Sequence, residues 1–185
     1  MVVAGIDYSM TSPAICVHKG KDWHIDNCTF YFQTGITKMV IDTDKIKGSM
    51  LMKHTSQEQR FFQNAVWSKG ILLAHNPELV ALEGYAMGAK GLIFNIAENT
   101  GMLKHIMWRE KIKFVTPPPT VLKKFATGKG NSNKEAMQEA FIKETGWTDL
   151  KQTLGQKESM FNPSGDLIDA YYACKYSFTE LLRNC

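Results

Sequence analysis

The order of apolar runs and amphipathic stretches in this 185-residue chain predicts a mixed α/β fold in a single domain, residues 1–185. Short apolar runs near the start, joined by turn-prone residues, are typical of antiparallel strands. Later segments alternate stretches of helical periodicity with further short strands. Together these patterns predict a mixed sheet, with three antiparallel strands followed by parallel strands and with helices on both faces.

The first three strands are expected near the amino terminus. Val2–Asp7 is a short apolar run that starts on β-branched residues, and Ala14–Lys19 is a second run of the same kind. The turn-prone stretch Lys19-Gly20-Lys21-Asp22 predicts a hairpin to a third strand, Trp23–Gln33. Thr34–Lys53 has weak periodicity, so we expect a mobile, lysine-bearing connection there.

Helices and strands alternate through the rest of the chain. Ser56–His75 is predicted as a helix because Ser56 can cap it and Asn76-Pro77 ends it. Its candidate apolar stripe consists of Phe61, Phe62, Ala65, Val66, Leu72 and Leu73. The other predicted strands are Leu79–Glu83 and Lys113–Thr116, the second of which is stopped by three prolines. The other predicted helices are Gly91–Glu110, Thr120–Ala126, Lys134–Glu144 and Gly165–Leu182.

Composition places the chain among ordinary globular proteins. It is 44% hydrophobic and 22% charged, which disfavours the disordered, collagen-like and disulfide-scaffold classes. Because no apolar run could span a bilayer and no signal-peptide pattern is present, we expect a protein of the bacterial or infected-host cytoplasm with no membrane partner. The histidines lack metal-binding spacing, so any metal would need oxygen ligands. Scattered cysteines predict free thiols at Cys16, Cys28, Cys174 and Cys185.

Positive charge is unevenly distributed along the chain. The net charge is only +4, but residues 111–134 contain six lysines and no acidic residue. Such a run is either a solvated surface or an electrostatic contact for a phosphate backbone. Charge alone leaves both interpretations open.

Four carboxylates stand in positions that are unusual for surface acids. Asp7 and Glu83 each follow a buried-looking strand at its carboxyl end, where ligands bind in open α/β sheets. Asp166 and Asp169 are three residues apart, so both project from nearly the same face of the last helix. Each alone could simply cap a helix or pair with a lysine. If all four converge, their repulsion raises their pKa values until divalent cations relieve it, and carboxylate oxygens suit Mg²⁺ or Mn²⁺.

This layout resembles the ribonuclease H-like nucleases, and more finely the RuvC-like Holliday junction resolvases, including their phage and viral members. The resemblance covers the chain from Gly5 to about Tyr176, with the motifs in the family's order. The motifs are GIDYSMTSPAICV, LVALEGY, TPPPTVLKKFATGKGNSNKEAMQ and SGDLIDAYYAC.

The resemblance implies a ribonuclease H-like fold and a structure-selective endonuclease that resolves Holliday junctions and other branched DNA. Such a crossover junction endodeoxyribonuclease hydrolyses phosphodiesters with two metal ions and leaves 5′-phosphate and 3′-hydroxyl ends. The implied ligands of Mg²⁺, for which Mn²⁺ would substitute, are Asp7, Glu83, Asp166 and Asp169. Lys123 and Lys134 would lie near the scissile phosphate, with Lys134 among the catalytic residues. Gly128 and Gly130 would shape a DNA-facing loop, and the lysine-rich segment predicts further DNA contacts at Lys124 and Lys129.

The sequence departs from the family pattern in three places. Ser9 stands where the family usually has glycine, two residues after the first Asp. The family often has an aromatic residue after the Glu that enters the junction centre; here the aligned position is near Ala86, so that role would fall to Tyr85 or Met87. The loop over residues 146–163 is longer than the family norm.

The motifs disfavour two other functions and leave a third open. An actin-like or sugar-kinase-like ATPase fragment needs a glycine-rich phosphate loop, which neither DYSMTS nor GKGNSNK provides. A catalytically inactive DNA-binding module is disfavoured because all four acids are present. Another ribonuclease H-like nuclease, acting on RNA–DNA hybrids or flaps, stays open as an alternative.

A four-way junction has two symmetric strands to cut, so paired incision predicts a homodimer with two related sites. Helix Gly91–Glu110 carries more apolar surface than one core-facing stripe requires. We therefore expect it to form much of the dimer interface, with the Glu83 strand beside it. The alternative is that it is a central buried helix.

Overall fold

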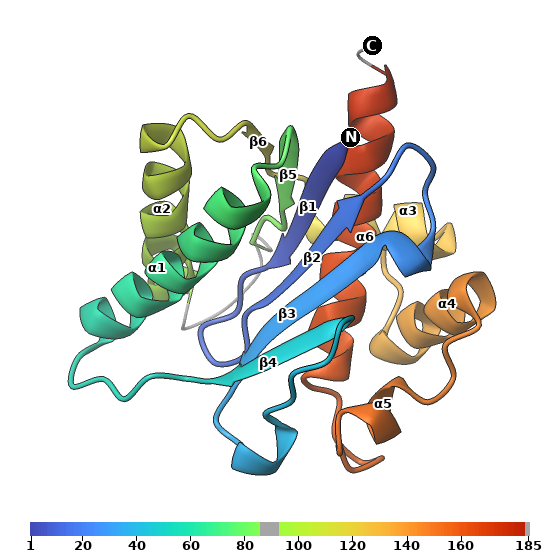
Figure 1. The fold of residues 1–185 in the computed structure, drawn as a ribbon, viewed down its shortest axis with the longest axis horizontal. Coiled ribbons are helices and arrows are strands. Elements are labelled where there is room, and N and C mark those ends of the chain that lie inside the picture. The colour runs from blue at the N-terminus through green and yellow to red at the C-terminus, as the bar shows by residue number, and fades with distance from the viewer. Residues whose placement is uncertain (86–92, 184–185) are drawn as a thin grey trace.

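A computed structural model describes residues 1–85 and 93–183, and these form a six-stranded mixed sheet with helices on both faces (Figure 1). The strands are β1 (Val2–Asp7), β2 (Ala14–Lys19), β3 (Cys28–Thr34), β4 (Ile46–Met50), β5 (Leu79–Leu82) and β6 (Phe114–Val115). Their order across the sheet is β4-β3-β2-β1-β5-β6. β1, β2 and β3 pair antiparallel, whereas β5 runs parallel to β1, β6 to β5, and β4 to β3. The predicted fold class is confirmed.

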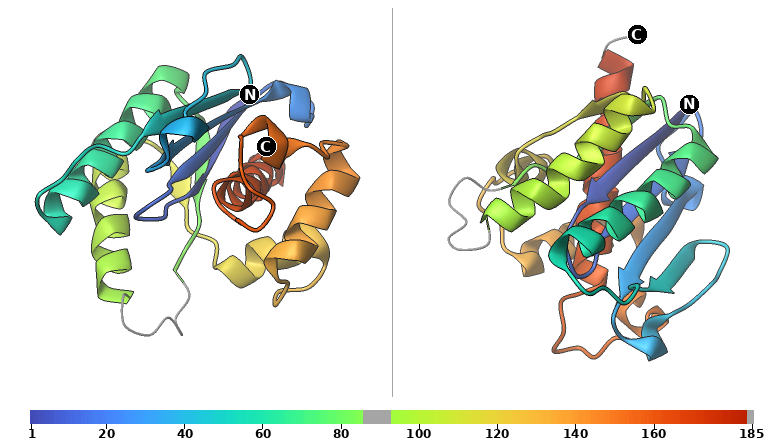
Figure 2. Two further views of the ribbon diagram at one scale, coloured as in Figure 1. Left: turned by 90° about the horizontal axis from the view of Figure 1, so that it is seen from below. Right: turned by 90° about the vertical axis from the view of Figure 1, so that its left-hand side faces the viewer.

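The helices lie in two layers around the sheet. They are α1 (Gln57–His75), α2 (Ile93–Arg109), α3 (Pro119–Thr127), α4 (Lys134–Thr145), α5 (Leu150–Thr153) and α6 (Ser164–Arg183). Figure 2 shows α1 and α2 on one side of the sheet and α6, α3 and α4 on the other. No helix in the described part of the chain is long and apolar enough to cross a bilayer.

The alternation of side chains along β1 divides the core between these two layers. Ala4 and Ile6 pack in the cluster under α1 and α2, whereas Val3 belongs to the cluster under α6. Since successive strand residues point to opposite faces, Asp7 falls on the α6 side with Val3. The same alternation in β5 directs Glu83 to the α6 side, because Val80 and Leu82 pack toward α1 and α2.

Two predictions for the first half of the chain are wrong. The third strand begins at Cys28 rather than at Trp23, because a 3₁₀ turn over Ile25–Asn27 precedes it. Trp23 leaves the sheet to stack on the His18 ring at 4.6 Å between centroids. The expected mobile connection contains a second 3₁₀ turn, Thr37–Met39, and the edge strand β4, which pairs with β3 through its backbone and therefore leaves little side-chain signal.

Other differences concern one helix face and one loop. Ser56 does cap α1, but only half of its predicted stripe is buried: Phe61, Ala65 and Leu72 are buried. The exposed half consists of Phe62, Val66 and Leu73. The long loop after α4 contains the short helix α5. The three described cysteines, Cys16, Cys28 and Cys174, are buried free thiols, as expected.

Candidate active site

The first carboxylate is placed by the end of β1. Asp7 pairs with Ala14 as the last rung between β1 and β2, so its backbone is fixed by the sheet. Tyr8 follows on the opposite face and is buried in the cluster under α1 and α2. The chain then turns through Ser9–Ser12, where the Ser12 backbone N–H donates to Ser9 Oγ at 2.8 Å. Ser9, the departure from the family glycine, thus stabilises this turn.

The second carboxylate is placed by the end of β5. The Glu83 backbone N–H donates to the Ile6 carbonyl at 2.9 Å, which continues the parallel ladder one residue beyond the strand. The Gly84 N–H then donates to the Pro117 carbonyl, also at 2.9 Å. Glu83 is therefore held beside Asp7 at the carboxyl edge of two adjacent parallel strands.

The remaining carboxylates come from α6, which crosses under the sheet. The helix packs against β1, β2 and β5, and Ser177 Oγ donates to the Ala4 carbonyl at 2.9 Å. Asp166 lies in its first turn and is buried, and Asp169 lies nearly one turn further along. This crossing brings a residue from the far end of the chain to the ends of β1 and β5.

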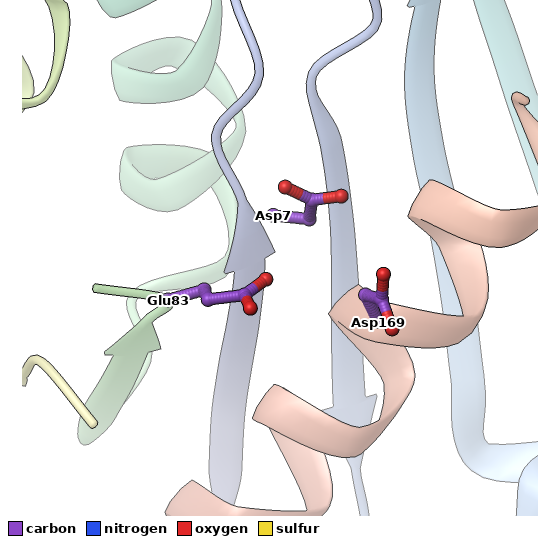
Figure 3. A group of neighbouring side chains, drawn as sticks. All are labelled: Asp7, Glu83 and Asp169. Atoms are coloured by element: carbon purple, nitrogen blue, oxygen red, sulfur yellow. The ribbon is translucent and has the colours of Figure 1, made fainter. Parts of the chain in front are cut away.

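Three of the four predicted carboxylates converge on one point. One oxygen from each of Asp7, Glu83 and Asp169 lies within 4.8 Å of the other two. Figure 3 shows the three side chains approaching one another from β1, the end of β5 and α6. Asp166 lies beside this group: its carboxylate is within hydrogen-bonding reach of Asp7, and its Oδ2 accepts a hydrogen bond from Ser12 Oγ at 2.5 Å.

Burial raises the pKa values of all four groups, and repulsion between neighbouring acids adds to the rise at Asp7, Glu83 and Asp169. Burial and the neighbouring acids raise the pKa of Asp7 well above its usual value. Burial and the Asp169 charge raise the pKa of Glu83 to about 8, against the opposing effect of Lys123. Burial raises the pKa of both Asp166 and Asp169 to about 6, while Lys134 opposes the rise in each.

The donor set fits a hard divalent cation. It consists only of carboxylate oxygens, which Mg²⁺ and Mn²⁺ prefer. None of the ion pairs found among residues 1–85 and 93–183 includes these acids, so their charges lack a direct cationic partner within the described chain. A half-buried group of acids without ion pairs is costly unless protons or cations neutralise it.

Two of the predicted basic residues lie near this site, one on α3 and one at the start of α4. Lys123 of α3 and Lys134, the first residue of α4, are both close enough to lower the pKa of Asp169. Lys124 and Lys129 are exposed further along this surface. Gly128 ends α3 with φ of +82°, and a Cβ at Gly130 would lie 3.0 Å from the Thr120 carbonyl oxygen. The glycines thus permit the tight loop.

Of the two candidate junction-entering residues, Tyr85 lies within the described part of the chain. Tyr85 is 38% exposed, and Lys104 Nζ lies 5.5 Å from the centre of its ring. Met87 lies outside the described residues.

Sequence reasoning missed three neighbours of the site, Ser12, Phe161 and Asn162. Asn162 donates from Nδ2 to Ser12 Oγ at 3.4 Å and accepts from Lys134 Nζ at 3.2 Å. The Lys134 ammonium also lies 5.4 Å from the centre of the Phe161 ring. The available signals were the serines after Asp7 and the length of the loop that ends at Pro163.

The sheet order, the helix layers and the position of α6 define a ribonuclease H-like α/β protein. No family model matches the sequence, and no curated protein matches it. Solved structures do match. Thermus thermophilus RuvC is 20% identical with a TM-score of 0.61, covering 99% of this chain and 97% of that one. T. thermophilus RuvC in complex with Holliday junction substrate is 19% identical with a TM-score of 0.62, covering 99% and 96%.

A viral structure also matches over nearly its full length. The fowlpox virus resolvase, solved with substrate Holliday junction DNA, is 16% identical with a TM-score of 0.53, covering 98% of this chain and 99% of that one. At these identities the likeness concerns the fold. The resemblance inferred from the sequence motifs is therefore confirmed in the architecture.

Proposed function

We propose that this protein is a metal-dependent endonuclease that resolves four-way DNA junctions, a crossover junction endodeoxyribonuclease. The observation that carries the proposal is the convergence of Asp7, Glu83 and Asp169 at the carboxyl ends of two parallel strands, with no ion pair to a cationic side chain among the residues that the structure describes. The solved structures of similar fold include two that hold Holliday junction DNA, which supports this substrate.

Asp7, Glu83 and Asp169 would hold Mg²⁺, for which Mn²⁺ would substitute, and Asp166 would lie beside them as a further ligand or as a support for Asp7. Bound divalent ions supply activation of the attacking water and stabilisation of the leaving 3′-oxygen, which leaves 5′-phosphate and 3′-hydroxyl ends. Lys123 and Lys134 would attract and orient the scissile phosphate from the side opposite the sheet.

The surrounding basic segment would bind the DNA backbone. Lys124 and Lys129 are exposed next to the loop shaped by Gly128 and Gly130, so their charges are accessible to phosphates. Tyr85 is exposed at the end of the Glu83 segment, and it would contact the DNA near the branch point together with Met87.

Paired incision would require a homodimer, and the exposed apolar surface of α1 and α2 would form its interface. A groove of about 520 Å³ between these helices has an apolar lining from Phe62, Val66, Leu73, Met102 and Ile106. Two further aromatic residues of α2, Phe94 and Trp108, are 78% and 71% exposed. Val80 and Leu82 of β5 are buried beneath these helices and Ala81 is buried on the opposite face, so the Glu83 strand itself would contribute little to the contact.

A cleavage assay on a panel of substrates tests the proposed function. Purified protein with Mg²⁺ or Mn²⁺ is given a four-way junction, a flap, an RNA–DNA hybrid and linear duplex of matched length. We expect cleavage of the junction, with ligatable nicks, and none with EDTA. Cleavage of the hybrid or flap in preference to the junction would favour another ribonuclease H-like nuclease, and cleavage that persists in EDTA would contradict the metal assignment.

A further inference from the structure

A chain of side-chain hydrogen bonds connects the end of the loop before α6 with the carboxylate site. Lys134 Nζ donates to Asn162 Oδ1 at 3.2 Å, and Asn162 Nδ2 donates to Ser12 Oγ at 3.4 Å. Ser12 Oγ in turn donates to Asp166 Oδ2 at 2.5 Å. This series of hydrogen bonds therefore connects α4, the loop before α6, the turn after β1 and the first turn of α6.

All three hydrogen bonds run in the same direction, with each donor on the Lys134 side and each acceptor on the Asp166 side. The ammonium can only donate and the carboxylate mainly accepts, so the two residues between them must each accept on one side and donate on the other. An asparagine amide and a serine hydroxyl do this. Bonds aligned in this way polarise and strengthen one another, which favours one arrangement of all four side chains.

The loop that carries Asn162 is fixed by its own contacts. The buried Gln156 donates from Nε2 to the Met160 carbonyl at 2.8 Å and accepts at Oε1 from the Ser164 N–H at 2.9 Å. The Phe161 carbonyl accepts from the Gly165 N–H at 2.7 Å, which joins the loop to the first turn of α6. These hydrogen bonds fix the backbone on both sides of Asn162.

The aromatic ring next to Asn162 also faces Lys134. Its centre lies 5.4 Å from Lys134 Nζ and 5.9 Å from Lys151 Nζ, distances at which an ammonium is attracted to a ring. Phe161 and Asn162 therefore supply an aromatic ring and an amide oxygen to the same ammonium. A hollow beside them is lined by Lys134, Phe161, Gly165 and Asp169, so this corner of the loop borders the site.

We propose that Asn162 and Ser12 are positioning residues for the nuclease reaction. They hold the Lys134 ammonium in a fixed position relative to Asp166 and the metal-binding carboxylates. This rests on the proposed function, because it takes Lys134 as the group that meets the scissile phosphate. A lysine side chain is long and flexible, so holding its ammonium increases the fraction of complexes in productive geometry. The long loop over residues 146–163 thereby acquires a role in the reaction.

The decisive comparison is between Asn162→Ala and wild type under single-turnover conditions on a four-way junction. Loss of a hydrogen bond to a charged group predicts a cleavage rate about 10-fold lower. The dissociation constant for the junction, measured in EDTA, and the melting temperature should stay unchanged. In a Lys134→Ala background the same substitution should cause no further loss, because its effect is transmitted through Lys134.

Two further readouts separate positioning from a general effect on folding. Ser12→Ala should lower the rate as Asn162→Ala does, whereas Ser12→Thr keeps a hydroxyl and should restore most of it. In the metal-free protein, Lys134 should react faster with an amine-acylating reagent once Asn162 is replaced. Ser159→Ala, at an exposed position of the same loop, is the matched control and should change none of these values.

Failure of this inference is distinguishable from failure of the proposed function. A wild-type protein that leaves junctions uncut with Mg²⁺ and Mn²⁺ would overturn both. A wild-type protein that cuts junctions, with Asn162→Ala equally active or with additive losses in the Lys134→Ala background, would overturn the positioning role alone.

Discussion

Gly5 of β1 lies directly against the backbone of Cys174 in α6. A Cβ built at Gly5 would come 1.9 Å from the Cys174 nitrogen and 2.4 Å from the Ala170 carbonyl oxygen. Only glycine permits β1 and α6 to approach so closely. Because Asp7 follows two residues later on the same face, this contact also sets the separation between Asp7 and Asp169.

Gly5→Ala should therefore be strongly destabilising. The added methyl group collides with backbone atoms that cannot rotate away, and overpacking of this kind lowers the free energy of unfolding by about 3 kcal/mol. Urea denaturation of the variant and the wild type measures the difference. Gly101→Ala is the control, because a Cβ there meets nothing within 4 Å and alanine favours the helix. Equal stability of the Gly5 variant would contradict the close approach.

The raised pKa of Glu83 predicts a stability that falls with pH in the absence of metal ions. Its pKa is about 8 in the folded protein, against an ordinary value of 4.5. Between these values the folded state holds a proton that the unfolded state has released, so the free energy of unfolding decreases as pH rises. Below about pH 4.5 both states are protonated and the group has no effect.

Glu83→Gln removes this titration. In EDTA at pH 8.5 the variant should melt above the wild type, by about 3 °C for each kcal/mol of relieved repulsion, and at pH 5 the two should melt together. Adding Mg²⁺ at pH 8.5 should raise the melting temperature of the wild type more than that of the variant. A variant that melts below the wild type at pH 8.5 in EDTA would show that the Glu83 charge is not a source of strain.

The sequence was sufficient to predict the parts of the fold that depend on local patterns. β1, β2, β5 and α6 follow from short apolar runs and helical periodicity. Asp7 and Glu83, at the ends of β1 and β5, could be singled out because charges rarely follow buried strands. β4 could not be predicted, because an edge strand held by backbone pairing carries little side-chain pattern. The start of β3 depended on Trp23 stacking against His18, a tertiary contact.

The residue types of the candidate site could be predicted from the sequence, but which acid contacts which neighbour could not. Spacing on one helix face places Asp166 and Asp169 together, and in the structure Asp169 meets Asp7 and Glu83 while Asp166 contacts both Asp7 and Ser12. Which acid meets which partner depends on how α6 crosses the sheet at Gly5. Asn162 was not predictable, because nothing local indicates that its loop returns to the turn after β1.

The lysine-rich surface predicts DNA binding that depends steeply on salt. Replacing both Lys124 and Lys129 with alanine should weaken binding of junction, flap and duplex alike, and should reduce the slope of log affinity against log salt by about 2. Fluorescence anisotropy over a salt series measures both quantities. The double replacement of Lys19, at the end of β2, and Lys21, in the turn that follows, is the control. Unchanged binding by the Lys124/Lys129 variant at moderate salt would refute this surface.

The apolar groove between α1 and α2 predicts a dimer at micromolar concentration. Val66→Glu would bury a charge in the apolar lining of the proposed interface, so the dissociation constant of the dimer should increase by at least about 10-fold. Sedimentation velocity measures the oligomeric state, and Val40→Glu, at a similarly exposed valine outside the groove, is the control. A wild-type monomer that still makes paired cuts would contradict the interface.

Asp7→Asn tests the carboxylate site most directly. The amide keeps the shape of the side chain but removes a negative charge that divalent ions need, so cleavage of the four-way junction should be abolished in Mg²⁺. Junction binding should survive or tighten, because the substitution reduces repulsion between the site and the phosphates. Cleavage and binding are measured on the same preparation, with Asp44→Asn as the control because Asp44 is an exposed aspartate in the connection before β4. Near wild-type cleavage by the Asp7 variant would refute the metal assignment, since the remaining acids would then suffice without the group at the centre of the cluster.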